Sequence, residues 1–97
     1  MKCSMQTVYT ETMRFDYETF IAVDIRRYRV GSDQDVVMEC HVCEDDINLV
    51  HTKEVVDSTA SDANLQRKGI KAFDALKAEF GERFSTVKAA QIVPLDF

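Results

Sequence analysis

The chain has 97 residues, of which 45% are hydrophobic and 30% are charged, and its formal net charge at pH 7 is −5. This composition is typical of one folded globular domain, so we expect a single domain over residues 1–97. No stretch has the ~18 apolar residues that a membrane-spanning helix needs, and the N-terminus lacks the apolar core of a secretory signal. The three cysteines cannot all pair within the chain, which favours a reducing compartment. We therefore expect a cytoplasmic protein that does not bind a membrane.

The negative charge is concentrated in the middle third of the chain. Residues 1–30 have five bases and four acids, and residues 63–97 have six bases and four acids. Residues 31–62 have nine acids and a single base, Lys53. A surface of one sign attracts partners of the opposite sign and repels the phosphates of nucleic acids. The charge distribution therefore favours a basic partner and argues against direct binding of nucleic acid.

The N-terminal part of the chain contains one clear strand and one ambiguous segment. Residues 5–13 are rich in threonine, valine and tyrosine, which are enriched in strands. In residues 16–30, Ile21, Val23 and Ile25 alternate with shorter or charged residues, as in a half-buried strand. The same segment also fits a helix, with Phe20, Ile21 and Ile25 on one stripe. We favour the strand because the alternation is regular.

The segment ECHVCEDDINLVH, residues 39–51, predicts a β-hairpin. Residues 35–43 alternate between two faces, and the run that starts at Ile47 alternates again. The acids between the two runs form a short turn, although no glycine supplies a position with positive φ. The two cysteines of the segment are then packing residues on opposite faces of one strand.

Residues 61–80 predict the longest helix. Ser61 is a suitable N-cap, Gly81 suits the end of the helix, and Gly69 predicts close packing against a neighbour. A further strand is expected over residues 86–93. The apolar stripe of the helix is expected to consist of Leu65, Ile70, Phe73, Leu76 and Phe80.

These elements predict an α+β fold, in which an antiparallel sheet of four or five strands packs against one long C-terminal helix. If residues 16–30 formed a helix, the order would be βαββαβ, which is that of the ferredoxin-like fold.

A zinc site is the alternative that the cysteines and histidines suggest. A zinc site with three cysteine ligands and one histidine ligand would use Cys40 and Cys43 of the C-x-x-C sequence, His51 and the distant Cys3. The strand pattern argues against it, because it places Cys40 and Cys43 on opposite faces. We therefore expect no metal ion and no other cofactor.

No nucleotide-binding, nucleophile or metalloprotease motif is present, so we expect a protein that is not an enzyme. The strongest functional hypothesis is an acidic binding protein that occupies a basic surface of a nucleic-acid-binding assembly, as a mimic of nucleic acid. Small acidic domains of this kind are common among phage-encoded inhibitors of host defence, including anti-CRISPR proteins; the analogy is one of size and charge. A homo-oligomer joined through sheet edges is a further alternative. The expected partner-binding residues are Asp33, Asp35, Glu39, Glu44, Asp45, Asp46 and Glu54.

Overall fold

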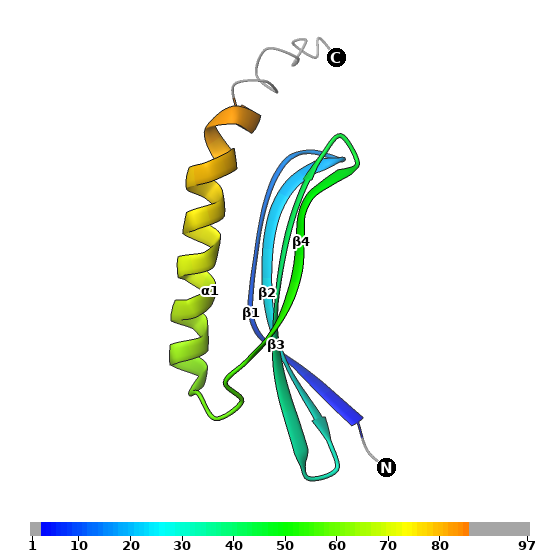
Figure 1. The fold of residues 1–97 in the computed structure, drawn as a ribbon, viewed down its shortest axis with the longest axis vertical. Coiled ribbons are helices and arrows are strands. Elements are labelled where there is room, and N and C mark those ends of the chain that lie inside the picture. Colours follow the sequence, from blue (N-terminus) through cyan, green and yellow to red (C-terminus); the bar gives the residue numbers. More distant parts are fainter. Residues whose placement is uncertain (1–2, 86–97) are drawn as a thin grey trace, which may run out of the picture.

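The fold is a four-stranded antiparallel sheet with one long helix on one of its faces, in a computed structural model that describes residues 3–85 (Figure 1). The strands follow one another in the order of the chain, so each consecutive pair forms a hairpin. They are β1 (Cys3–Asp16), β2 (Thr19–Val30), β3 (Asp33–Glu44) and β4 (Ile47–Val56). The predicted α+β fold is confirmed, with four strands in the described residues. The strand expected over 86–93 lies outside them.

Residues 16–30 form a turn followed by β2, so the strand interpretation is confirmed and the ferredoxin-like alternative is wrong. Ile21, Val23 and Ile25 are fully buried on the face that meets the helix. Their neighbours in the sequence lie on the opposite face and are partly exposed. This period of two matches a strand with one covered face, and burial on that face outweighs the helical stripe.

The helix begins where the sequence predicts and ends later. α1 (Asp62–Leu76) is capped by Ser61, whose Oγ accepts a hydrogen bond from the Asn64 N–H at 3.2 Å. A π-helical turn, η1 (Lys77–Gly81), follows, and helical structure continues to residue 85. The predicted stop at Gly81 is therefore wrong. The continuation places Phe84 in the core, with no exposed surface.

The core lies between the helix and strands β1, β2 and β3. α1 lies mainly over β1 and β2, and Leu65 and Phe73 are buried as predicted. Ile70, which was expected on the same stripe, is 49% exposed. The buried face of the helix is narrower than the predicted apolar stripe, because position 70 lies at the edge of the face that meets the sheet.

Gly69 allows the close approach that its position predicts. A Cβ atom there would lie 2.7 Å from Cγ of the Tyr9 ring on β1, so no side chain fits without moving that ring. A Cβ at Gly81 would meet only the Lys77 side chain, at 3.4 Å.

Replacing these two glycines by alanine is expected to have opposite effects on stability. Alanine favours a helix over glycine by about 1 kcal/mol, so Gly81→Ala is expected to stabilise the fold by up to that amount. Gly69→Ala is expected to lower the free energy of unfolding by about 1–2 kcal/mol, because overpacking against Tyr9 outweighs propensity. Urea unfolding of both variants checks this pair. A stabilised Gly69→Ala protein would contradict the close contact.

Candidate functional site

The seven acids expected to form one patch are divided between two ends and two faces of the sheet. Asp33 and Glu44 begin and end β3, which puts them roughly 35 Å apart at the usual rise per residue. Glu39 lies on the face away from the helix, whereas Glu54 is opposite Met38 and so lies on the helix side. The hairpin is therefore acidic in sequence but does not form one continuous acidic surface.

The structure instead gathers acids where two turns meet at one end of the sheet (Figure 1). The Asp46 N–H donates to the Glu18 carbonyl at 3.0 Å, and the Asp45 N–H donates to the buried Thr19 Oγ1 at 3.1 Å. These bonds connect the β3–β4 turn to the β1–β2 turn. We call the resulting group the acidic tip; it consists of Asp16, Glu18, Asp45 and Asp46, all of which are exposed.

Tyr17 lies within the acidic tip and is 98% exposed. Together with Arg14, Phe15 and Asp16 it lines an open hollow beside the turn. A tyrosine that combines a large ring with a polar hydroxyl contributes more binding energy than most residues when a partner covers it. The tip therefore combines negative charge with an aromatic side chain suited to an interface.

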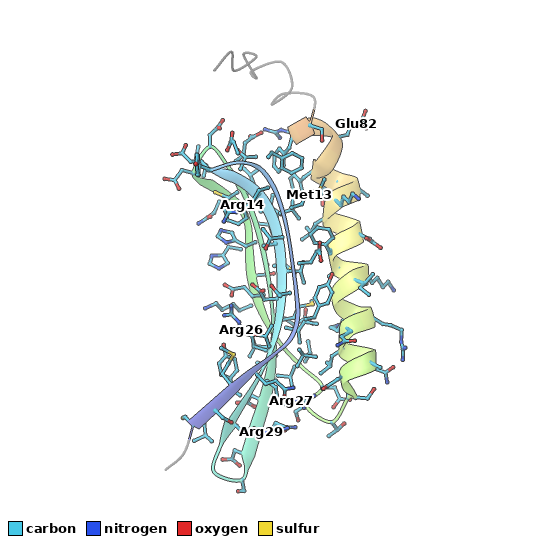
Figure 2. The ribbon with its side chains drawn as sticks, turned by 180° about the vertical axis from the view of Figure 1, so that it is seen from behind. Met13, Arg14, Arg26, Arg27, Arg29 and Glu82 are labelled. Atoms are coloured by element: carbon cyan, nitrogen blue, oxygen red, sulfur yellow. The ribbon has the colours of Figure 1, made fainter. Side chains whose placement is uncertain are left out.

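The basic side chains near the acidic tip are held in other interactions (Figure 2 labels Arg14). Arg14 lies over the Phe20 ring, 5.0 Å from its centroid, and donates to the Tyr17 carbonyl at 3.4 Å. Arg83 pairs with Glu44 at 2.6 Å and joins the end of the helix to β3. Glu44 is thus neutralised locally. The four residues of the tip are exposed, and the Asp16 carboxylate accepts a hydrogen bond from the Glu18 N–H at 2.8 Å.

The β3–β4 turn has aspartates at two positions where asparagine or glycine would adopt the backbone conformation with less strain. Asp45 and Asp46 have φ values of 50° and 68°. Two consecutive positive φ values define the type I′ hairpin turn, in which Asn-Gly is the favoured pair. Two of the four acidic residues of the tip therefore occupy backbone conformations that are unfavourable for aspartate compared with glycine.

Asp46→Gly is expected to raise the free energy of unfolding by about 0.5–1 kcal/mol, because glycine adopts positive φ without strain. Asp35→Gly, which removes the same charge from the interior of β3, is expected to lower it by a similar amount. Thermal and urea unfolding of both variants test the turn geometry. Destabilisation by Asp46→Gly would show that the aspartate stabilises the turn.

Asp33 and Asp35 lie at the opposite end of β3, near the β2–β3 turn. Their partners in the sheet are Val30 and Tyr28. Arg27 and Arg29 lie on the same part of β2 (Figure 2). Arg27 is buried and pairs with Asp62 at 2.9 Å. This end therefore carries both signs of charge.

The sheet face away from the helix has a row of ring contacts that crosses all four strands. The Phe20 ring packs edge-on against His41 at 4.9 Å, and His41 stacks on His51 at 4.4 Å. Arg14 of β1 completes the row over Phe20. His41 Nε2 lies 2.6 Å from Asn48 Oδ1. Both histidines of the hairpin are thus held by cross-strand contacts.

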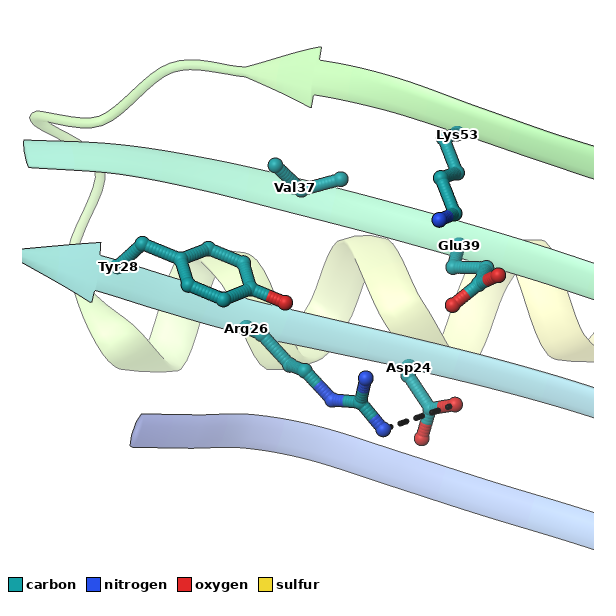
Figure 3. A pocket seen from close by; sticks show the side chains of 6 residues that line it. All are labelled: Asp24, Arg26, Tyr28, Val37, Glu39 and Lys53. Carbon is teal, nitrogen blue, oxygen red and sulfur yellow. Dashed lines mark ion pairs between the residues drawn. The ribbon is translucent and has the colours of Figure 1, made fainter. Parts of the chain in front are cut away.

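The same face has a shallow hollow whose charges balance (Figure 3). Glu39 lies beside Lys53 and is bonded to His51 Nε2 at 2.7 Å. Asp24 lies 3.9 Å from the Arg26 guanidinium. Tyr28 and Val37 form its apolar part. A face whose charges balance in this way has little net attraction for a basic partner. Glu39 is therefore distant from the acidic tip, and its charge is balanced by its neighbours.

The hydrogen bond from His51 lowers the pKa of Glu39 below its ordinary value of 4.5, although burial opposes the shift. A carboxylate with a lowered pKa stabilises the fold at higher pH, and this contribution is lost as the pH falls through the lowered pKa. Glu39→Gln is therefore expected to be less stable than wild type by about 0.5 kcal/mol at pH 6, as for other exposed pairs. Urea unfolding over a pH series should show the difference shrinking below pH 4.5; a constant difference would contradict this.

The four residues of the zinc alternative are not brought together. Cys40 lies on the core face of β3 and Cys43 on the other face, as predicted, while Cys3 is opposite Val30 near the far end of β1. His51 is bonded to Glu39. Within residues 3–85 no group of three or more His, Cys, Asp or Glu residues is arranged to hold a metal ion.

The two hairpin cysteines are also poorly suited to redox chemistry. Burial raises the pKa of the Cys40 thiol, and burial together with the charge of Asp46 raises that of Cys43. A reactive cysteine needs the opposite shift, because the thiolate is the nucleophile. The C-x-x-C sequence is therefore part of the packing of the hairpin.

Sequence reasoning missed Asp16, Tyr17 and Glu18, which contribute half of the acidic tip and its aromatic side chain. These residues lie in a part of the chain whose overall charge is slightly positive. One signal was available: in a four-stranded meander, the first and third turns lie at the same end of the sheet. The segments DYE and EDD would then have been recognised as neighbours.

Comparison with known proteins finds no match to this chain among family models, curated proteins or solved structures. In the part of the chain that the structure describes, no helix combines the length and the apolar character needed to cross a membrane.

Proposed function

We propose that the chain is a non-enzymatic binding protein that docks its acidic tip on a basic surface of another protein. In its sharpest form, the tip takes the place of nucleic-acid phosphates on a nucleic-acid-binding assembly and inhibits it. The site of action is the cytoplasm. The observation that carries this proposal is the contact between the two turns, which brings four exposed acidic residues to the end of the sheet where Tyr17 lies.

Electrostatics support a role in recognition. Charges of one sign steer a partner of the opposite sign and speed the encounter, and they suppress binding to acidic surfaces. The four tip residues are exposed. Of the two nearby arginines, Arg83 pairs with Glu44, and Arg14 lies over the Phe20 ring and donates to the Tyr17 carbonyl. The other acids of the hairpin are dispersed or locally balanced. The tip is therefore the surface on which a basic partner would gain most.

The turn conformation supports the same assignment. A hairpin selected for stability alone would favour Asn-Gly at positions 45 and 46. The chain has Asp-Asp there, with positive φ at both residues. Local rules of this kind are broken most often at functional sites.

Affinity capture from a nuclease-treated cell lysate tests the proposal. Three immobilised proteins are compared: wild type, Glu18→Lys with Asp46→Lys, and Asp33→Lys with Asp35→Lys. The second and third change the net charge equally but at opposite ends of the sheet. A nucleic-acid-binding protein retained by the first and third baits, and absent from the second, is the expected result. Equal retention by all three baits would overturn the proposal.

A further inference from the structure

The two edges of the sheet differ in how well they are protected. β1 has register shifts at Thr7/Tyr9 and at Arg14/Asp16, and bulges of this kind hinder pairing with another strand. α1 covers part of β1, and Gln66 Nε2 donates to the Val8 carbonyl at 3.3 Å. The β1 edge is therefore interrupted and partly covered.

The β4 edge is exposed, and it is regular from Val50 to Val56. Its pairing with β3 has one register shift, which falls at Leu49. α1 lies over β1, β2 and β3, which leaves β4 the strand farthest from the helix contact. Val55 is 72% exposed and Ile47 is 64% exposed. An exposed edge strand with apolar side chains is a template for pairing with a further strand.

We infer that β4 pairs antiparallel with β4 of a second copy, so that two sheets join into one of eight strands about a two-fold axis at Thr52. This inference is independent of the acidic tip. A two-fold register centred on Lys53 or Glu54 would place like charges directly opposite each other, which is unfavourable. The register centred on Thr52 avoids this and pairs threonine with threonine.

Charge complementarity supports a second copy as the occupant. In this register, Lys53 of one copy lies opposite His51 of the other, on the face where His51 holds Glu39. Each lysine is thus brought near a carboxylate of both copies. Val55, which is 72% exposed, lies at the end of the regular segment, where β4 of the second copy covers it. We therefore infer that the exposed edge of β4 is covered by β4 of the second copy.

Solution mass measured by light scattering or sedimentation over a wide range of concentration tests the inference. The expected mass is twice the 11.1 kDa of one chain. Thr52→Lys places two lysines at the axis and is expected to weaken association by about 100-fold. Thr12→Lys, at an exposed position on β1, is the matched control and is expected to leave association unchanged.

Cross-linking tests the register separately. In a Cys3→Ser background, Thr52→Cys is expected to form a disulfide-linked dimer on mild oxidation, whereas Thr12→Cys is not. A monomeric protein at all concentrations would overturn the inference. So would a dimer that is sensitive to Thr12→Lys, or one that is insensitive to both substitutions, because the contact would then lie elsewhere.

Discussion

Phe84→Ala is expected to lower the free energy of unfolding by about 3–4 kcal/mol, which is typical for removing a fully buried aromatic ring. Phe84 has no exposed surface, packs edge-on against Phe15 at 5.4 Å and stacks with Phe80 at 5.8 Å. These contacts connect the last turn of the helix to β1. A loss of this size is a large part of the 5–15 kcal/mol that stabilises an ordinary domain.

Ile70→Ala is the control for this substitution. Ile70 lies on the same helix but is 49% exposed, so its truncation is expected to cost about 0.5 kcal/mol or less. Urea unfolding of both variants, with the helix content followed by circular dichroism, makes the comparison. Equal losses for the two variants would mean that the helix does not contribute Phe84 to the core.

Reversal of charge at the acidic tip is expected to weaken binding to the basic partner by about 100-fold, or ~2.7 kcal/mol, for Glu18→Lys with Asp46→Lys. The reason is that two attractive contacts become repulsive against the same surface. Asp33→Lys with Asp35→Lys is expected to change the affinity by less than about threefold, because charges beyond ~8 Å are largely screened at physiological ionic strength. Titration calorimetry with the captured partner measures both values.

Salt provides a second readout of the same interaction. Affinity of the wild-type protein is expected to fall as salt is raised, since exposed charges are screened more strongly. The residual affinity of the tip variant should depend on salt much less. A tip variant that binds as tightly as wild type, with the same salt dependence, would show that the acids only solvate the surface.

Elements with a regular period were predictable from the sequence. The alternation of Ile21, Val23 and Ile25 identified β2, and the hairpin from 35 onward followed from the same pattern. Ser61 identified the start of the helix, since a cap depends on local hydrogen bonds. The end of the helix was not predictable, because it depends on the tertiary burial of Phe84 and not on the local preference of Gly81.

The acidic site was predictable only in part, because proximity along the chain is a poor guide to proximity in a sheet. Asp33 and Asp45 lie in one acidic segment but at opposite ends of a long strand. Glu18 and Asp46 lie far apart in the sequence, yet their backbones are joined by a hydrogen bond. A strand order was needed before these charges could be grouped correctly.

Photo-cross-linking from the acidic tip tests the central claim most directly. Tyr17 is replaced by the photoreactive amino acid benzoylphenylalanine, and Asp35 is replaced in the same way as the control at the far end of the sheet. We expect irradiation of the complex to link position 17, but not position 35, to a lysine- and arginine-rich peptide of the partner. A cross-link from position 35 with none from position 17 would contradict the assignment of the tip as the binding surface.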